Sequence, residues 1–351
     1  MKILSAAGRV RKLKMNVFTR YLIQMIPSRT IRRKIREPLR KDYLHQLAEE
    51  IWSAGRVSPE WLSLLALLAQ GRSPWNELNP DVWLMYASAL RKIGETGKAA
   101  LILEKYARRF GLDRIEFILP LAEFAEQIGL ANPRISASAR AFRLLEGNRK
   151  AGALAGLLRG KSVAVVGNGP SEIGTGHGGR IDSHDLVIRF NNYKTEGFQK
   201  DYGSRTSIWV TSAGKDVSHD RPYADYEMTV IGPNLWHTFL GEEERAHLLE
   251  TVQKTDRVVT FDPATQSELW EALDNCPSYG LVCVWSILRQ DLTRLTPDDL
   301  FGFSFLQHTK QIYAEHYFKG ESPAERKRRS GAHNFITESE FIEKLFRQNG
   351  E

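Results

Sequence analysis

The second half of the chain alternates between short apolar runs and longer segments of helical periodicity, and no other feature of the sequence restricts the fold as strongly. Each run is rich in Val, Ile or Phe and is bounded by turn residues, as buried strands are. The runs are VAVV (163–166), DLVIRF (185–190), SIWV (207–210), MTVI (228–231), RVVTF (257–261) and LFGF (300–303). The segments EEERAHLLETVQ, TQSELWEAL and YGLVCVWSILRQ between the later runs have helical spacing. The sequence therefore predicts an α/β domain whose mainly parallel sheet is covered by helices on both faces.

Residues 46–143 show helical periodicity and no strand signal. EWLSLLALLAQ (60–70) is apolar on most faces, and apolar residues repeat at helical spacing over 81–111 on both sides of a Gly-Glu-Thr-Gly turn. This helix pair resembles one tetratricopeptide unit, and a degenerate second copy runs through 115–143; a plain helical bundle is the open alternative. Small and basic residues over 147–160 indicate a boundary. We predict an all-helical domain over 46–150 and the α/β domain over 151–351.

The first 45 residues form a basic leader. Residues 1–41 contain 13 Lys and Arg and one acid, a charge of +12, whereas the rest has 36 basic and 41 acidic residues, or −5. Apolar residues between 11 and 26 recur at spacings that place them on one helix face. The segment is therefore predicted to lie as a basic amphipathic helix on an anionic membrane surface, and a solvated tail is the alternative. Nucleic acid is not the expected partner, because Phe18 and Tyr21 are the only aromatic residues of the basic stretch 1–41.

Composition points to the cytoplasm. No apolar run approaches the roughly 18–20 residues of a membrane span, and no segment has the pattern of a secretory signal. The two cysteines, Cys276 and Cys283, form neither a CxxC pair nor a disulfide framework. These features predict a bacterial-type cytoplasmic protein, held peripherally at the inner membrane face if the leader binds lipid.

Polar and flexible residues follow three of the predicted strands. Gly167 and Asn168 follow the first, Asn191 and Asn192 the second, and a Thr-Ser pair the third. Ligands of open parallel sheets bind beyond the carboxyl ends of the strands, so these residues mark a candidate nucleotide site. Each one taken singly is also an ordinary turn residue. The glycines over 174–179 are predicted to form a loop, because they lie too far from the first strand for a dinucleotide-binding fingerprint.

Four motifs in the second half resemble those of the sialyltransferases, glycosyltransferase family 29. The segment VAVVGNGPSEIGTGHGGRIDSHDLVIRFNNYKTEGFQKDYGSRTS (163–207) resembles the family's long motif. CPSYGLVCVWSIL (276–288) followed by FGF (301–303) resembles the short motif, His316–Tyr317 the third, and HNFITE (333–338) the very short one with its His-x₄-Glu spacing. The resemblance implies a Rossmann-like sheet of a GT-A-like variant and makes 151–351 a catalytic domain.

The resemblance also implies the chemistry. The family transfers a sugar acid from a CMP-sugar donor to a glycan or glycolipid hydroxyl with inversion, and it needs no metal or other cofactor. By this resemblance His333 is the general base and His316 assists departure of the CMP phosphate. The residues expected at the donor are Gly167, Asn168, Asn191, Ser278, Tyr279 and Gly280. Ser278 is also a natural helix cap, and Glu338 either orients the site or is only an acid near a helix start, in a capping box that begins at Thr337.

Some residues depart from the family pattern. The short motif reads PSYG where PSTG is usual, and Val163 occupies the position of the first cysteine of the disulfide found in animal members. These departures fit a cytoplasmic enzyme of surface polysaccharide or lipopolysaccharide synthesis that uses sialic acid or another ulosonic acid. A CMP-Kdo transferase of the same fold is one alternative. A helical-repeat interaction protein that has lost activity is another.

Overall fold

The computed structural model describes residues 57, 59–70, 80–212, 217, 221–232, 239–273, 276–303 and 335–349. In this part of the chain the six predicted strands all form, each within two residues of its predicted limits. They are β1 (Val163–Val166), β2 (Leu186–Phe190), β3 (Ile208–Thr211), β4 (Met228–Ile231), β5 (Val258–Thr260) and β6 (Leu300–Phe301). They pair in parallel in the order β5-β4-β3-β2-β1-β6. The prediction of an α/β fold with a mainly parallel sheet is confirmed.

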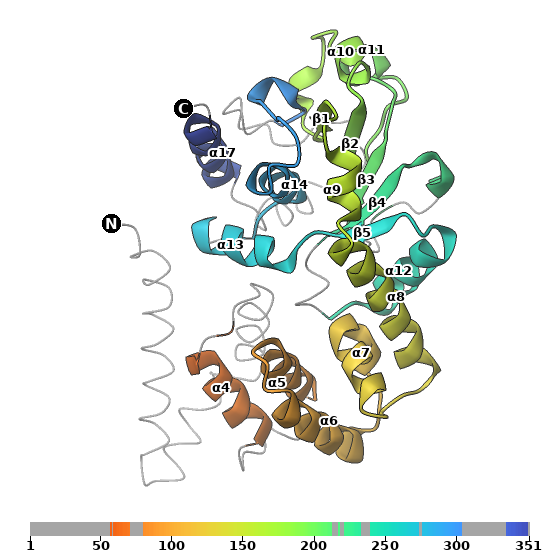
Figure 1. Ribbon diagram of the computed structural model, residues 1–351, viewed down its shortest axis with the longest axis vertical. Coiled ribbons are helices and arrows are strands. Elements are labelled where there is room, and N and C mark those ends of the chain that lie inside the picture. Colours follow the sequence, from red (N-terminus) through yellow and green to blue (C-terminus); the bar gives the residue numbers. More distant parts are fainter. Residues whose placement is uncertain are drawn as a thin grey trace, which may run out of the picture.

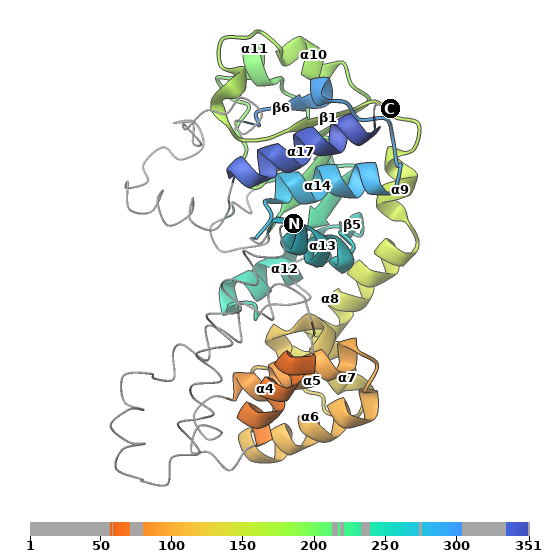
Figure 2. The same cartoon turned by 90° about the vertical axis from the view of Figure 1, so that its left-hand side faces the viewer.

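Helices cover both faces of this sheet (Figure 1). The helices of one face are α9 (Ala153–Leu158), α13 (Pro263–Leu273), α14 (Tyr279–Arg289) and α17 (Phe335–Asn349), which share an apolar core with the strands. The helices of the other face are α8 (Pro133–Lys150), α10 (Gly178–Asp182), α11 (Gln199–Tyr202) and α12 (Glu242–Lys254). Figure 2 shows α14 and α17 running side by side across the sheet. Three of these helices, α12, α13 and α14, were predicted from their periodicity.

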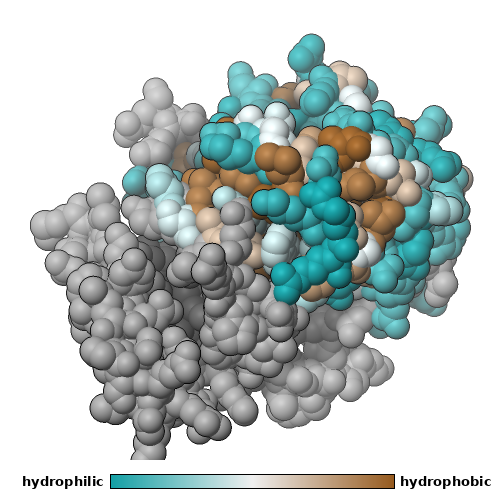
Figure 3. All heavy atoms as spheres, turned by 90° about the horizontal axis from the view of Figure 1, so that it is seen from below, coloured by the Kyte–Doolittle hydropathy of each residue, from teal (hydrophilic) through white to brown (hydrophobic). Residues whose placement is uncertain are grey.

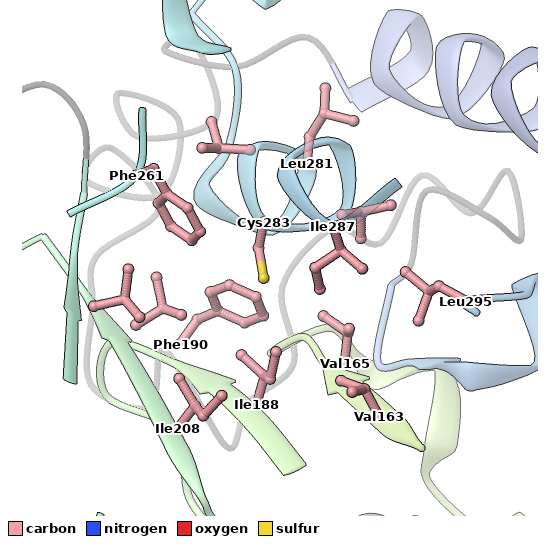
Figure 4. Close-up of a cluster of buried hydrophobic side chains, with 14 of the residues drawn as sticks. Val163, Val165, Ile188, Phe190, Ile208, Phe261, Leu281, Cys283, Ile287 and Leu295 are labelled. Carbon is pink, nitrogen blue, oxygen red and sulfur yellow. The ribbon is translucent and has the colours of Figure 1, made fainter. Parts of the chain in front are cut away.

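Strand residues alternate between the two faces, as the period of a strand requires. In β1, Val163 and Val165 face α14, whereas Ala164 and Val166 face α10 and α11. Figure 4 shows the first of these cores, in which Cys283 of α14 points toward Phe190 among aliphatic side chains. Burial raises the pKa of the Cys283 thiol to about 12, so this cysteine is a packing residue and not a nucleophile.

Four helices and part of α8 form the N-terminal region. They are α4 (Pro59–Gln70), α5 (Asp81–Lys92), α6 (Thr96–Phe110), α7 (Leu119–Gln127) and α8. The turn between α5 and α6 contains Gly94 at φ +83°, a conformation that glycine adopts without strain. Most of the apolar residues of this region are buried in a core of their own. The helical end of the molecule, seen in Figure 3, nevertheless shows scattered apolar surface, and Ile93 and Leu101 of this region are exposed. The helix pairs are as predicted, while their assignment to tetratricopeptide units stays a prediction.

Helix α8 joins the helical region to the sheet and belongs to both. Its apolar residues Phe142 and Leu145 pack with Leu119 of α7 and with Val258 of β5 in one cluster. The Asn148 side chain donates hydrogen bonds to the carbonyls of Asp256 and Val258, 3.0 and 2.6 Å away. The segment 147–160, where a boundary was predicted, contains the end of α8, which continues to Lys150, and all of α9, which follows after two residues. The domain limits stay a prediction.

The leader and several loops lie outside the described residues, so the predicted amphipathic helix of residues 1–41 stays a prediction. Among the described helices, none combines the length and apolar character that crossing a membrane would require.

Gly178 supplies a stability prediction, because a Cβ at this position would collide with the backbone carbonyls of Gln199 and Lys200. Gly178→Ala is expected to lower the free energy of unfolding by about 2–4 kcal/mol, since backbone atoms cannot move aside as a side chain can. Gly179→Ala is the matched control, because its Cβ would meet nothing within 4 Å. Urea unfolding of both variants measures the difference, and equal stabilities would contradict the packing of α10 on α11.

Candidate active site

The strand order reverses between β1 and β6. From β1 the chain goes to β2 on one side, while β6 lies against the other side of β1. Ligands of such sheets bind at the carboxyl end of this switch point. The loops that follow β1 and β6 touch there: Gly167 donates a hydrogen bond to the Phe301 carbonyl, and Gly169 donates one to the Gly302 carbonyl, both at 2.7 Å. A Cβ on Gly167 would lie 2.6 Å from the Gly302 oxygen, so glycine is required at this contact.

Asn168 and Asn191 connect the ends of three neighbouring strands. The Asn168 amide donates to the Phe190 carbonyl at 3.0 Å, which ties the loop after β1 to the end of β2. The Asn191 amide oxygen accepts from the Ser212 N–H at 2.9 Å, which ties β2 to β3. These bonds engage the NH₂ group of Asn168 and the amide oxygen of Asn191. The structure thus brings the two predicted donor residues together at one edge.

Asn191 has a backbone conformation that fits this position. Its φ of +47° lies in the left-handed region, which asparagine tolerates better than most residues. The Asn191 carbonyl accepts from the Trp209 indole N–H at 2.9 Å, and its N–H donates to the Val210 carbonyl at 2.8 Å. Both backbone groups are therefore fixed by β3, and the side chain is held in one place at the strand end.

Glu172 stabilises the contact between the β1 and β6 loops, and the sequence analysis did not identify it. The side chain is buried, and one carboxylate oxygen accepts from the Gly302 N–H at 3.0 Å while the other contacts His177 Nδ1 at 2.7 Å. Tyr202 adds a hydrogen bond from its hydroxyl to the Gly169 carbonyl. The one sequence signal was an acid in a glycine-rich loop five residues before a histidine, a common pattern on protein surfaces.

The short-motif helix α14 begins at this edge and is bound to α17. Ser278 Oγ caps α14 by accepting from the Leu281 N–H at 3.3 Å, so the capping role is confirmed. The same hydroxyl donates to Glu338 Oε2 at 2.6 Å, and the Ser278 N–H donates to Glu338 Oε1 at 2.8 Å. Glu338 therefore holds the residue that was predicted to face the donor.

The capping box predicted at Thr337 is wrong. Helix α17 already begins at Phe335, which places Thr337 inside its first turn. Glu338 lies in the same first turn but is not a surface acid: 1% of its area is exposed, and its carboxylate accepts from Ser278. The interaction crosses 60 residues of chain, so the local pattern could not reveal it.

Glu338 has a shifted acidity. Desolvation raises its pKa to about 7, although the two hydrogen bonds from Ser278 favour the charged form. The half-buried thiol of Cys276 lies in the same region, and burial together with the Glu338 charge raises its pKa to about 12. The thiol is therefore neutral near pH 7, while the protonation of Glu338 changes there.

Tyr279 and Gly280 continue this edge from Ser278. A Cβ on Gly232, the residue after β4, would lie 2.6 Å from Tyr279 Cε1 and 2.7 Å from its hydroxyl, so the phenol ring lies directly on that glycine. A Cβ on Gly280 would lie 2.6 Å from the Phe303 ring. These two close approaches fix the first turn of α14 between the ends of β4 and β6.

Other polar residues of the long motif form a structural network. Asp182 accepts from the backbone N–H groups of Ser204 and Arg205, and the Arg205 guanidinium donates to three carbonyls at the end of α10. These hydrogen bonds hold the Asp182 pKa below its usual value against the opposing effect of burial. His316 and His333 lie outside the described residues, so their assignments as catalytic groups stay predictions.

Comparison with known proteins agrees with the resemblance found in the sequence. Residues 141–229 match the family described as glycosyltransferase family 29 (sialyltransferase). Alpha-N-acetylgalactosaminide alpha-2,6-sialyltransferase 2 of Mus musculus is 28% identical over 196 residues, which cover 45% of this chain and 51% of the mouse protein. A beta-1,6-galactosyltransferase of Arabidopsis thaliana is 51% identical over 47 residues, which cover 13% of this chain and 12% of the plant protein.

The chain thus spans about half the length of the mouse relative and less of the plant one. A crystal structure of a mammalian sialyltransferase in complex with Gal-beta-1-3GalNAc-ortho-nitrophenol has a TM-score of 0.42 and 19% identity, and the match covers 66% of this chain and 82% of that one. These relatives are animal and plant proteins, and the expectation of a bacterial-type member stays a prediction. From the middle of α8 to the start of β4, the chain is similar to glycosyltransferase family 29, the family of the sialyltransferases.

Proposed function

We propose that this protein is an inverting glycosyltransferase that moves sialic acid or a related ulosonic acid from a CMP-sugar to a glycan hydroxyl. The observation that carries the proposal is the convergence at one sheet edge of residues from separate motifs. Asn168 and Asn191 come from the long motif, and Ser278 comes from the short motif and is held by Glu338. Such a site offers amide groups and a helix start to a nucleotide with one phosphate.

The proposed reaction is a single displacement. An acceptor hydroxyl loses its proton to His333 as its oxygen attacks the anomeric carbon, and CMP leaves from the opposite face with help from His316. The sugar carbon passes through an oxocarbenium-like state, and the electron pair of the broken bond goes to the phosphate oxygen. A departing nucleoside monophosphate needs less charge neutralisation than a diphosphate, so the reaction is proposed to proceed without a metal ion.

The proposal also names a donor sugar and an acceptor. The mouse relative is named as a sialyltransferase, whereas the plant relative is named as a galactosyltransferase. Similarity to this region therefore does not by itself fix the donor, and the CMP assignment depends on the motif residues. We propose a cell-surface glycan or glycolipid precursor as acceptor, reached by an enzyme in the cytoplasm that binds the inner membrane face through residues 1–41.

Nucleotide binding tests the proposal directly. CMP and CMP-sugars are expected to raise the midpoint of thermal unfolding, with UDP, GDP and UDP-galactose as matched alternatives. Addition of EDTA is expected to change neither this stabilisation nor the release of CMP from a CMP-sugar in the presence of acceptor. Stabilisation by UDP-galactose without any effect of CMP would replace the proposal by a galactosyltransferase. Stabilisation by no nucleotide would favour an inactive interaction protein.

A further inference from the structure

The close approaches at Gly232 and Gly280 form one row of contacts along the carboxyl edge of the sheet. At one end the Tyr279 ring lies on Gly232 after β4, and at the other the Phe303 ring after β6 lies on Gly280. Phe303 also contacts the Phe190 ring at the end of β2, with 6.4 Å between ring centroids. The row therefore runs from β6 to β4 on the face of the sheet that α14 covers.

The row spans most of the sheet edge. Three strands, β3, β2 and β1, lie between β4 and β6, so the two ends are four strand spacings apart. At about 4.8 Å per spacing this is about 19 Å. Tyr279 and Gly280 are adjacent in α14, and each contacts a different end of this distance. The Tyr279 ring extends to Gly232 after β4, and the Phe303 ring extends from the end of β6 to Gly280. The Tyr279 ring therefore occupies the β4 end of the row.

The β6 side of the candidate site is closed by backbone. Gly167 and Gly302 are in direct contact, Gly169 donates to the Gly302 carbonyl, and Glu172 accepts from the Gly302 N–H. A donor that contacts Asn168 and Asn191 therefore meets a packed backbone wall toward β6. Along the described edge, the remaining direction is toward β3 and β4, where the Tyr279 ring lies.

We propose that Tyr279 determines which sugar acid the site accepts, an inference that rests on the proposed function. The family motif has threonine at this position, whose side chain is five heavy atoms smaller than that of tyrosine. The tyrosine ring fills the space against Gly232. Less room is therefore left there for the sugar part of the donor, which extends away from the nucleotide. The ring favours an eight-carbon ulosonic acid without an N-acyl group over a nine-carbon acid that carries one.

Donor competition tests the inference with Tyr279→Thr. Wild-type protein is expected to have a kcat/KM at least about tenfold higher for the CMP-linked eight-carbon acid than for the nine-carbon N-acylated one, and the variant is expected to reverse or abolish this ratio. Tyr86→Thr, the same substitution on α5, is expected to leave the ratio unchanged. A ratio unaffected by Tyr279→Thr, or a wild-type preference for the larger acid, would overturn the inference.

A second measurement tests the underlying contact without any activity. Gly232→Ala should lower the midpoint of thermal unfolding in the wild-type background, because the new methyl group meets the Tyr279 ring. The same substitution should have little effect in the Tyr279→Thr background, where the ring is gone. Equal effects in both backgrounds would contradict the packing on which the inference depends. If this coupling is found but no CMP compound binds, the proposed function fails, and with it the specificity role, while the contact itself stands.

Discussion

Replacing Glu338 by alanine is expected to weaken CMP binding by at least about tenfold and to lower the free energy of unfolding by about 2–4 kcal/mol. The substitution removes the acceptor of both the Ser278 N–H and its hydroxyl, and it leaves a cavity between α14 and α17. A buried donor without an acceptor costs about 1–3 kcal/mol, and the lost packing adds to this. The binding loss follows because the first turn of α14 loses the contact that fixes its position.

Glu340→Ala is the matched control, because Glu340 lies two residues further along the same helix and is exposed. Thermal shift with CMP measures binding, and urea unfolding measures stability. If both variants bind CMP as the wild-type protein does, Glu338 serves stability only. If both are as stable as the wild type, the Glu338–Ser278 interaction contributes nothing.

Glu338→Gln separates charge from shape and gives a dependence on pH. The pKa of Glu338 is about 7 in the folded protein and near 4.5 when unfolded. Below pH 4.5 both states hold the proton. Between pH 4.5 and 7 the unfolded chain releases it first, so stability falls as pH rises, and above pH 7 the loss is complete. Relative to Glu338→Gln, wild-type protein is expected to lose about 3 kcal/mol across this window. A constant difference between the two would show that the carboxyl titrates normally.

The sheet could be predicted from the sequence because its strands are buried on both faces. VAVV is entirely apolar and MTVI contains one polar residue, Thr229, which is buried, and the observed limits of both strands agree with the predicted ones. Small deviations occur where polar side chains end a strand: Asp185 was included in the second run, but its carboxylate accepts from the Ser162 N–H and β2 begins one residue later. The position of β6 beside β1 could not be predicted, since this pairing joins residues 135 apart in the chain, Val165 with Leu300 and Val166 with Phe301.

The candidate site, like the sheet, was predicted from the sequence only in part. Asn168 and Asn191 were predicted because their strands end at the same edge, a consequence of parallel pairing alone. The interactions of Glu338 with Ser278 and of Glu172 with Gly302 were not predicted, because each joins segments far apart in sequence. Both carboxylates are buried, and a buried acid needs hydrogen-bond donors that only the tertiary structure supplies. The sequence therefore indicated which residues form the site more readily than what holds them in place.

The largest effect on turnover is expected at His333. As the proposed general base, it removes the acceptor proton and does not contact the nucleotide, so His333→Ala should lower the rate of transfer by about 10²–10⁴-fold and leave CMP binding nearly unchanged. His316 is proposed to act on the departing phosphate, and His316→Ala should therefore lower turnover and also weaken CMP binding. The two histidines are thus distinguished by nucleotide affinity.

The chain offers a control for these substitutions in His247, which lies on α12 outside the four motifs, with its ring 4.0 Å from the Glu250 carboxylate. His247→Ala is expected to keep both the transfer rate and CMP binding. Because an imidazole base must be neutral to accept a proton, wild-type kcat/KM should rise with pH through the usual imidazole range of about 6–7. Glu338 titrates in the same range, so the rise must be measured in Glu338→Gln, where only the histidine remains to cause it. Transfer by His333→Ala at more than a tenth of the wild-type rate, or a flat profile in Glu338→Gln, would remove His333 from the mechanism.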